Sequence, residues 1–271
     1  MNEKQIGVDY SELHQLDSPA NRLIRESIWG VEDDIGQQSF ITPRYLDELI
    51  RRLGIDEKSY MLDVGSGAGG PAIYIASKTR CSVSGIEIND VGVDVSKKLA
   101  NNSGLEEKTE FYLGDAMKMP FEENIFDLAI CLNVMNVFED KTGLFKEVYR
   151  VLKPSGKWVF LSGTFEMPDD DEIRHKMARG YLIPQHYDSL QSYRKMLELA
   201  GFKIEEITEY VADFWVQVKK WGDAYKKHST VISKEQGEEN TKYHIEYFDT
   251  YLKLVEDGKA ANHLIISTKP E

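Results

Sequence analysis

The sequence predicts an α/β fold in which a largely parallel sheet carries helices on both faces. Two observations lead to this prediction. Five apolar, strand-like runs alternate with helical stretches between residues 60 and 162, and such alternation implies right-handed crossovers and parallel pairing. In addition, residues 126–132 (Phe-Asp-Leu-Ala-Ile-Cys-Leu) are almost all apolar, as expected for a central parallel strand buried on both faces.

Composition narrows the class of protein. The 271 residues are 41% hydrophobic and 29% charged, which suits one large α/β domain or one domain with a sizeable insertion. The net charge of -13 argues against a nucleic-acid partner, because affinity for phosphate backbones rests on clustered Lys and Arg. No segment is of the signal-peptide type or long enough to span a bilayer, so we expect a cytoplasmic location and no membrane partner.

Two short helices are expected before the first strand. They begin at Ser18-Pro19 and Thr42-Pro43, because a hydroxyl can cap the first turn and proline needs no hydrogen-bond donor there. Each is closed by a glycine. Residues 29–40, between them, are too polar and glycine-rich for a core element, and residues 1–17 are polar and expected to be mobile or lid-like.

The most informative stretch is residues 60–70, Tyr-Met-Leu-Asp-Val-Gly-Ser-Gly-Ala-Gly-Gly. An apolar run stops at a glycine cluster, and Pro71 then opens a helical stretch, which predicts a strand, a tight turn and a helix. Glycines allow a backbone to turn sharply and to approach a ligand closely. Turns at the carboxyl ends of parallel strands are where open α/β sheets bind nucleotides.

Asp63 distinguishes between two kinds of ligand for this turn. Gly65, Gly67 and Gly70 satisfy the dinucleotide pattern G-x-G-x-x-G, which alone is a weak signal. A carboxylate at the strand end would repel a pyrophosphate on the same loop, but it is compatible with a ligand that carries an ammonium and a sulfonium. A purely structural strand–helix turn is the remaining alternative.

Two further acidic residues follow predicted strands. Glu87 lies in the predicted strand 82–88, 24 positions after Asp63. This distance is close to the ~20 residues expected between the glycine turn and a carboxylate that accepts both hydroxyls of a ribose. Asp115 comes directly after the predicted strand 109–114. Because parallel strands end at the same edge of a sheet, both carboxylates are expected near the glycine turn.

The second half of the chain predicts a fifth strand at residues 157–162, a sixth at 202–211 and a seventh at 263–268. About fifty residues separate the last two, with helical periodicity of their own, and an unstructured loop of that length would be uncommon. Trp221, Phe248 and Leu252 lie in aromatic and apolar stripes that usually form a core. Alternatively, aromatic residues of this insertion form a cage for an amine cation; the candidates are Trp215, Tyr243 and Tyr247.

No metal site and no disulfide are expected. Cys81 and Cys131 fall in or beside predicted strands, where two buried thiols are expected. The acidic run Asp169–Asp171 lacks spaced partners and is more typical of a solvated helix start. His175 and His186 are isolated in the sequence and are expected at the surface.

The glycine turn resembles the first motif, D-x-G-x-G-x-G, of the class I S-adenosylmethionine-dependent methyltransferases. Residues 29–40 are similar to the corresponding segment of small-molecule N-methyltransferases of the glycine/sarcosine and phosphoethanolamine types. The resemblance implies a Rossmann-like, seven-stranded methyltransferase sheet whose last strand is antiparallel. From the same resemblance we expect three parts in the chain. They are an N-terminal helical lid (1–54), a cofactor-binding α/β domain (55–213 and 263–271) and a helical, substrate-capping insertion between the last two strands (214–262).

The resemblance also implies cofactor contacts, at positions that match the family's motifs. Glu87 would bind the ribose, Asp115 and Ala116 the adenine, and the others the methionine portion or the turn. The positions are Gln37, Gln38, Asp63, Gly65, Ser66, Gly67, Gly69, Glu87, Ile88, Asp115, Ala116, Leu132 and Asn133.

The chain departs from the family after the fourth strand. Many relatives have a histidine in that loop, but this chain has Asn136 or Val137, and neither can take a proton. Asn136 is therefore expected to hydrogen-bond the substrate, and no catalytic residue is identified.

The activity implied is methyl transfer from S-adenosylmethionine, with S-adenosylhomocysteine as product and without a metal, to a small-molecule acceptor that is most simply an amine nitrogen. An O- or C-methyltransferase and a non-catalytic cofactor-binding module remain open alternatives. A nicotinamide-dependent dehydrogenase is disfavoured by Asp63. A monomer or a homodimer is expected.

Overall fold

The structure is a computed structural model and describes residues 11–166, 169–179, 185–210 and 214–271. The expectations for residues 1–10 and for the end of the predicted sixth strand at Val211 lie outside this part of the chain.

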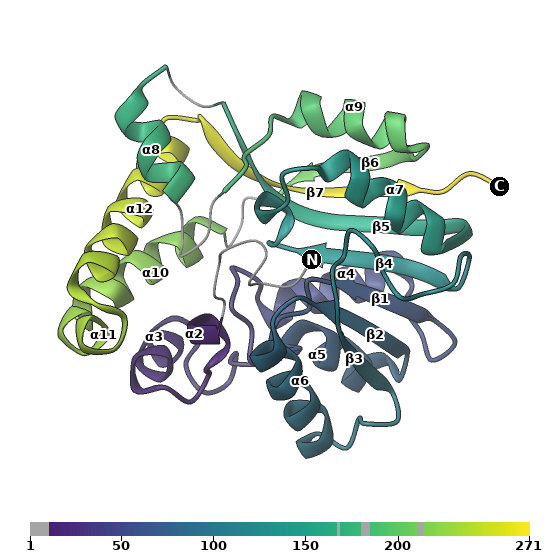
Figure 1. Ribbon diagram of the computed structural model, residues 1–271, viewed down its shortest axis with the longest axis horizontal. Coiled ribbons are helices and arrows are strands. Elements are labelled where there is room, and N and C mark those ends of the chain that lie inside the picture. The colour runs from purple at the N-terminus through teal and green to yellow at the C-terminus, as the bar shows by residue number, and fades with distance from the viewer. Residues whose placement is uncertain (1–10, 167–168, 180–184, 211–213) are drawn as a thin grey trace.

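One seven-stranded sheet organises the molecule, with strand order β3-β2-β1-β4-β5-β7-β6 (Figure 1). The first five strands pair in parallel, and β7 is antiparallel to both β5 and β6. The predicted Rossmann-like sheet with an antiparallel last strand is confirmed. The strands are β1 (Tyr60–Val64), β2 (Ser82–Glu87), β3 (Thr109–Leu113), β4 (Phe126–Leu132), β5 (Leu152–Phe165), β6 (Lys203–Glu209) and β7 (Ala260–Thr268).

Helices cover both faces of the sheet, as predicted (Figure 1). One face packs on α4 (Pro43–Leu53), α5 (Gly70–Thr79) and α6 (Asp90–Asn102), and the other on α7 (Lys141–Val151) and α9 (Leu190–Ala200). Alternate residues of β1 enter the two cores, Met61 one and Leu62 the other, because successive strand side chains point to opposite faces. The Thr42 side chain accepts a hydrogen bond from the Tyr45 backbone N–H, so the predicted cap of α4 is confirmed.

Strands β5 and β7 extend further than the sequence predicted. Their antiparallel pairing runs from Lys157 opposite Thr268 to Phe165 opposite Ala260. Each strand therefore supplies the hydrogen-bond partners that lengthen the other. The extension carries Gly163 and Phe165 past the ends of the parallel strands, toward the helices that follow β6.

A third core lies beside the carboxyl ends of the parallel strands. Here α3 (Pro19–Trp29), from the N-terminal segment, packs on α10 (Phe214–Lys227) of the insertion (Figure 1). Trp29, Trp221 and Phe248 are buried together in this core. The other helices of the group are α8 (Asp171–Arg179), α11 (Ser229–Gln236) and α12 (Glu238–Glu256); α11 is separate from α12 because Gly237 interrupts them at φ +89°.

Candidate functional site

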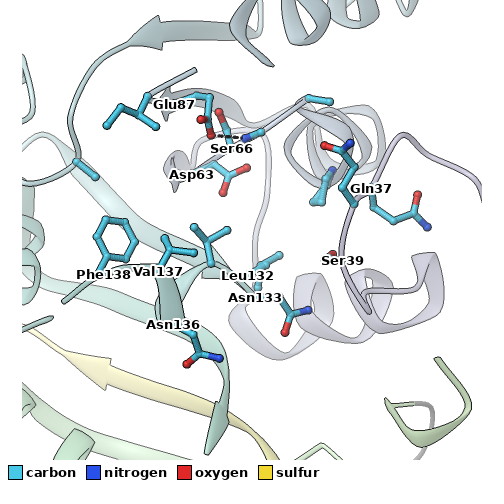
Figure 2. A pocket seen from close by; sticks show the side chains of 18 of the residues that line it. Gln37, Ser39, Asp63, Ser66, Glu87, Leu132, Asn133, Asn136, Val137 and Phe138 are labelled. Carbon is cyan, nitrogen blue, oxygen red and sulfur yellow. Dashed lines mark hydrogen bonds between the residues drawn. The ribbon is translucent and has the colours of Figure 1, made fainter. Parts of the chain in front are cut away.

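A cavity of about 710 Å³ opens at the carboxyl ends of β1, β2 and β4. Figure 2 shows Asp63, Ser66 and Glu87 at one end and Asn136 at the other, with Leu132, Asn133, Val137 and Phe138 between them. The volume lies in the range of small-molecule sites, about 300–1,000 Å³. The two ends are called the carboxylate end and the acceptor end below.

The glycine turn forms the floor of the carboxylate end. Gly65 and Gly67 have φ values of +71° and +53°, which L-residues with side chains rarely adopt. Gly70 allows a close backbone approach, because a Cβ there would lie 2.5 Å from the Ile35 carbonyl oxygen and 2.9 Å from the Gln37 nitrogen. This approach holds residues 36–40 over the turn, where they line the cavity.

Glu87 is 7% exposed and joins three segments of the chain. Its Oε2 accepts from the Gly67 backbone N–H at 2.9 Å, and its Oε1 accepts from the Asn89 backbone N–H at 3.0 Å. The Nε2 of His14 lies 4.0 Å from Oε1. The carboxylate is therefore held in place while it lines the cavity (Figure 2).

His14 is a lining residue that the sequence analysis missed. It ends α2 (Ser11–His14), within the segment expected to be mobile or lid-like, yet it is 4% exposed. Its Nδ1 is 2.7 Å from the Gln38 Oε1. The ring packs so closely that a Cβ on Gly67 or Gly92 would come within 3.2 Å of it. A lone histidine in a polar segment carries no pattern that sequence reasoning could have used.

Asp63 is buried at the end of β1, with 4% of its surface exposed. Desolvation, and secondarily the charge of Glu87, raises the pKa of its carboxyl group from 3.8 to about 7. A shift of this size is typical of functional sites, where a ligand supplies the missing counter-charge.

The other predicted cofactor positions fall in two groups. Ile88, Asp115 and Ala116 line the cavity beyond β2 and β3, and Asp115 accepts from the Met117 backbone N–H at 2.9 Å. Gly69 does not line it; a Cβ there would meet the Ser96 side chain at 2.7 Å, so its role is to bring α5 close to α6.

Two buried polar atoms on the cavity wall have no hydrogen-bond partner within the described structure. They are the Ser66 Oγ and the Asn133 Nδ2. Asn133 has φ +62°, and its Oδ1 accepts from the Asn262 Nδ2 at 3.3 Å. An unpartnered buried polar atom is costly, so both atoms indicate that a polar ligand completes this wall.

Gln37 and Gln38 line the cavity but also make protein contacts. The Gln37 Oε1 accepts from the Ile35 backbone N–H at 2.8 Å, and its Nε2 donates to the Asp33 carbonyl at 2.8 Å. Gln37 therefore shapes the segment over the glycine turn, and Gln38 ties that segment to His14.

The acceptor end is aromatic. Trp221, Tyr247, Phe248 and Tyr251 line it together with Phe40. Of the residues proposed for a cage, only Tyr247 lines the cavity: Trp215 packs against the third core, and the Tyr243 hydroxyl donates to Glu239 on the outside of α12. Trp221 and Phe248 belong both to the third core and to the cavity wall. This is possible because an aromatic ring can pack against the core on one side and line a cavity on the other.

Asn136 lines the acceptor end of the cavity (Figure 2). Its Oδ1 accepts from the Ser162 Oγ at 3.1 Å and from the Tyr193 hydroxyl at 3.4 Å. These bonds direct its Nδ2 toward Gly163, where a Cβ would lie 3.3 Å away. The amide N–H of Asn136 therefore points toward Gly163 on the cavity wall.

His186 corrects the sequence analysis, which placed it at the surface. It is half-buried and lines the cavity near Asn136, and the Asn136 carbonyl accepts from its backbone N–H at 2.7 Å. No local pattern marks this residue, because its position depends on a backbone hydrogen bond to Asn136, which is distant in the sequence.

Other features of the described residues concern metals, thiols and membranes. They contain no group of three His, Cys, Asp or Glu placed to hold a metal ion. Cys81 and Cys131 are buried free thiols, as predicted. None of the helices that the structure describes is both long and apolar enough to cross a bilayer.

Comparisons with known proteins agree with this fold. Residues 62–160 match the family described as "Methyltransferase domain". The sterol 24-C-methyltransferase of Kluyveromyces lactis is 34% identical over 169 residues, which cover 60% of this chain and 45% of that protein. The chain thus spans less than half the length of this curated relative.

Two solved structures share the fold over nearly the whole chain. A candidate sarcosine dimethylglycine methyltransferase from Galdieria sulphuraria superposes with a TM-score of 0.79 at 20% identity, covering 96% of this chain and 98% of that one. Phosphoethanolamine N-methyltransferase 2 of Haemonchus contortus, solved with phosphomonomethylethanolamine and S-adenosylhomocysteine, superposes with a TM-score of 0.78 at 17% identity, covering 97% and 61%. The sequence match at residues 62–160 and the fold both support a class I S-adenosylmethionine-dependent methyltransferase.

Proposed function

We propose that the protein binds S-adenosylmethionine in this cavity and transfers its methyl group to a small molecule. The proposal rests on the placement of Asp63, Glu87 and Asp115 at the ends of three neighbouring strands, all lining one cavity. The described residues that line it include no Lys and no Arg. Such a wall suits a ligand with an ammonium and a sulfonium, and it opposes a pyrophosphate.

The residues of the carboxylate end fit the parts of this cofactor. In this proposal Glu87 accepts from the ribose hydroxyls, and Asp115 and Ala116 bind the adenine. Leu132, Asn133 and the segment with Gln37 and Gln38 would hold the methionine portion. The cofactor would also give the orphaned Ser66 Oγ and Asn133 Nδ2 their partners.

The proposed acceptor is an amine nitrogen. The cofactor supplies an electrophilic methyl carbon on sulfur, so the protein mainly has to align the nucleophile and exclude water. The aromatic faces of Trp221, Tyr247 and Tyr251 can hold an amine cation, while the Asn136 amide fixes a polar atom of the acceptor. In the same proposal, the insertion 214–262 caps the acceptor end, and residues 11–54 of the N-terminal segment cover the cofactor. Residues 1–10 of the expected lid lie outside the described part of the chain.

An oxygen or carbon acceptor is the second candidate. The relative from Kluyveromyces lactis is named as a methyltransferase of a sterol carbon, and an aromatic wall also suits an uncharged, apolar acceptor.

Calorimetric titration with S-adenosylhomocysteine tests the proposal. We expect micromolar binding that one class of amine tightens, when primary, secondary and tertiary amines are added in turn. Binding that no amine affects would favour an oxygen or carbon acceptor. Absence of binding would contradict the proposed cofactor.

Replacing Glu87 with alanine should weaken S-adenosylhomocysteine binding by about 1.5–3 kcal/mol, the usual worth of hydrogen bonds to a charged group. Calorimetry measures the change. Glu107→Ala is the matched control, because Glu107 is exposed and distant from the lining residues. Equal affinity in the Glu87 variant and the wild type would contradict the proposed ribose site.

A further inference from the structure

His186 enters the acceptor end from a segment far along the chain from the glycine turn. Its backbone N–H donates to the Asn136 carbonyl at 2.7 Å, and its own carbonyl accepts from the Lys141 Nζ at 2.7 Å. Both main-chain polar groups of His186 are therefore hydrogen-bonded within the protein. The imidazole is the polar group of this residue that can interact with a ligand in the cavity.

A buried lysine fixes this position. The Lys141 side chain is 0% exposed, and its Nζ lies 2.8 Å from the Asp188 Oδ2 and donates to the Phe138 carbonyl at 2.8 Å. Desolvation lowers the pKa of Lys141, whereas the hydrogen bond and charge of Asp188 oppose that change. Lys141 thus joins the loop after β4 to the segment that carries His186, so the two cannot move apart without exposing an unpaired buried charge.

The other described titratable groups of the lining are poorly placed to take a proton from an acceptor. His14, Asp63, Glu87 and Asp115 belong to the carboxylate end. Burial raises the pKa of Tyr251 well above its ordinary value, and the Tyr247 hydroxyl is 2.9 Å from that of Tyr187. Glu139 and Asp140 are exposed at the rim, where Asp140 caps α7 by accepting from the Gly143 N–H.

We propose that His186 is the catalytic residue that accepts the proton of the methyl acceptor, an inference that rests on the proposed function. The amine enters as an ammonium, and the His186 imidazole takes its N–H proton, which then passes to solvent past the rim. The freed lone pair of the nitrogen forms the bond to the methyl carbon, and the carbon–sulfur bond breaks with its electron pair kept by sulfur.

The test compares His186→Asn with the wild type, using His175→Asn as the matched control because His175 is exposed on α8. The rate of S-adenosylhomocysteine formation is measured from pH 5.5 to 9 with saturating S-adenosylmethionine and sarcosine, dimethylglycine, ethanolamine or benzylamine as probes. We expect kcat to fall by about 10²-fold in His186→Asn. The decline of kcat at low pH, present in the wild type and in His175→Asn, should disappear.

Binding of S-adenosylhomocysteine to His186→Asn should match the wild type by calorimetry. A normal kcat and pH profile, or a change confined to KM, would overturn the proposal. The wild type and the variant share the other titratable groups around this end, so a difference between their pH profiles belongs to His186. These groups are Glu139, Asp140, Lys141, Tyr187, Asp188, Tyr193, Tyr247 and Tyr251.

A second measurement does not depend on turnover. Diethyl pyrocarbonate labels accessible, unprotonated imidazoles, and peptide mass spectrometry identifies the labelled residue. We expect His186 and His175 both to react at pH 7.5, and His186 to react more slowly once an amine and S-adenosylhomocysteine are present. Labelling of His175 without His186 would overturn the proposal. A third outcome is that the wild type binds S-adenosylhomocysteine and His186 is labelled, but none of the amine probes is methylated. That outcome would contradict the proposed amine acceptor rather than the position of His186.

Discussion

Replacing Asp63 with asparagine is expected to stabilise the ligand-free protein at pH 8 and to weaken its binding of S-adenosylmethionine. Burial raises the folded-state pKa of Asp63 to about 7, above its ordinary value of 3.8. The folded protein therefore holds this proton more tightly than the unfolded chain. Its free energy of unfolding should fall as the pH rises from about 4 to about 7, and stay low above that range.

The size of the effect follows from the shift. Each unit of pKa corresponds to about 1.4 kcal/mol, so ionised Asp63 costs the folded state on the order of 4 kcal/mol at pH 8. Asparagine has nearly the same shape without the charge, so the cost is removed. The variant loses the attraction to a cationic ligand, and we expect about 1.5–3 kcal/mol weaker binding.

Urea unfolding at pH 5 and pH 8, with calorimetry at pH 6 and pH 8, checks both halves of this prediction. Wild-type affinity should rise between pH 6 and pH 8 as Asp63 ionises, whereas the affinity of Asp63→Asn should not. Asp94→Asn, on the exposed side of α6, is the control. A variant less stable than the wild type at pH 8, with unchanged affinity, would contradict the prediction.

Replacing Gly70 with alanine is expected to displace the segment that covers the glycine turn. The new Cβ would lie 2.5 Å from the Ile35 carbonyl oxygen and 2.7 Å from the Gly36 carbonyl carbon. Both are backbone atoms, so no side-chain rotation relieves the collision. We expect the free energy of unfolding to fall by about 1–3 kcal/mol and cofactor affinity to fall more than tenfold, because residues 36–40 line the cavity.

Gly258→Ala separates the two effects of the Gly70 substitution. Gly258 has φ +69° and no atom within 4 Å of a Cβ, and it lies outside the lining. This control should lose stability through backbone strain and keep the wild-type affinity. Calorimetry with S-adenosylhomocysteine and urea unfolding compare the two variants. Equal affinity in both would mean that residues 35–37 do not close the site.

Much of the carboxylate end could be predicted from the sequence, because local patterns encode it. The glycine turn, Asp63, Glu87 and Asp115 each stand next to a strand that its own apolar run defines. Parallel strands bring their carboxyl ends to one edge of the sheet, so the sequence alone predicts that these distant residues lie together. Their contacts with a cofactor remain predictions.

The acceptor end depends on packing between distant segments. Periodicity placed Trp221 and Phe248 in a core, but only the folded insertion decides that their rings also face a cavity. The same periodicity gave no means to separate Tyr247, which lines the cavity, from Tyr243, which lies one helical turn earlier and outside it. A helix exposes several faces, and its neighbours decide which face is buried.

The sequence by itself determined the α/β class and the acidic, glycine-rich strand ends, because each rests on short-range patterns of burial and backbone conformation. The antiparallel last strand was implied only by the resemblance to a known family. Only the tertiary structure brought His14 beside Glu87 and His186 beside Asn136. Both histidines lie in segments without periodicity, and their positions come from non-local hydrogen bonds and a buried lysine, which no local pattern of residues records.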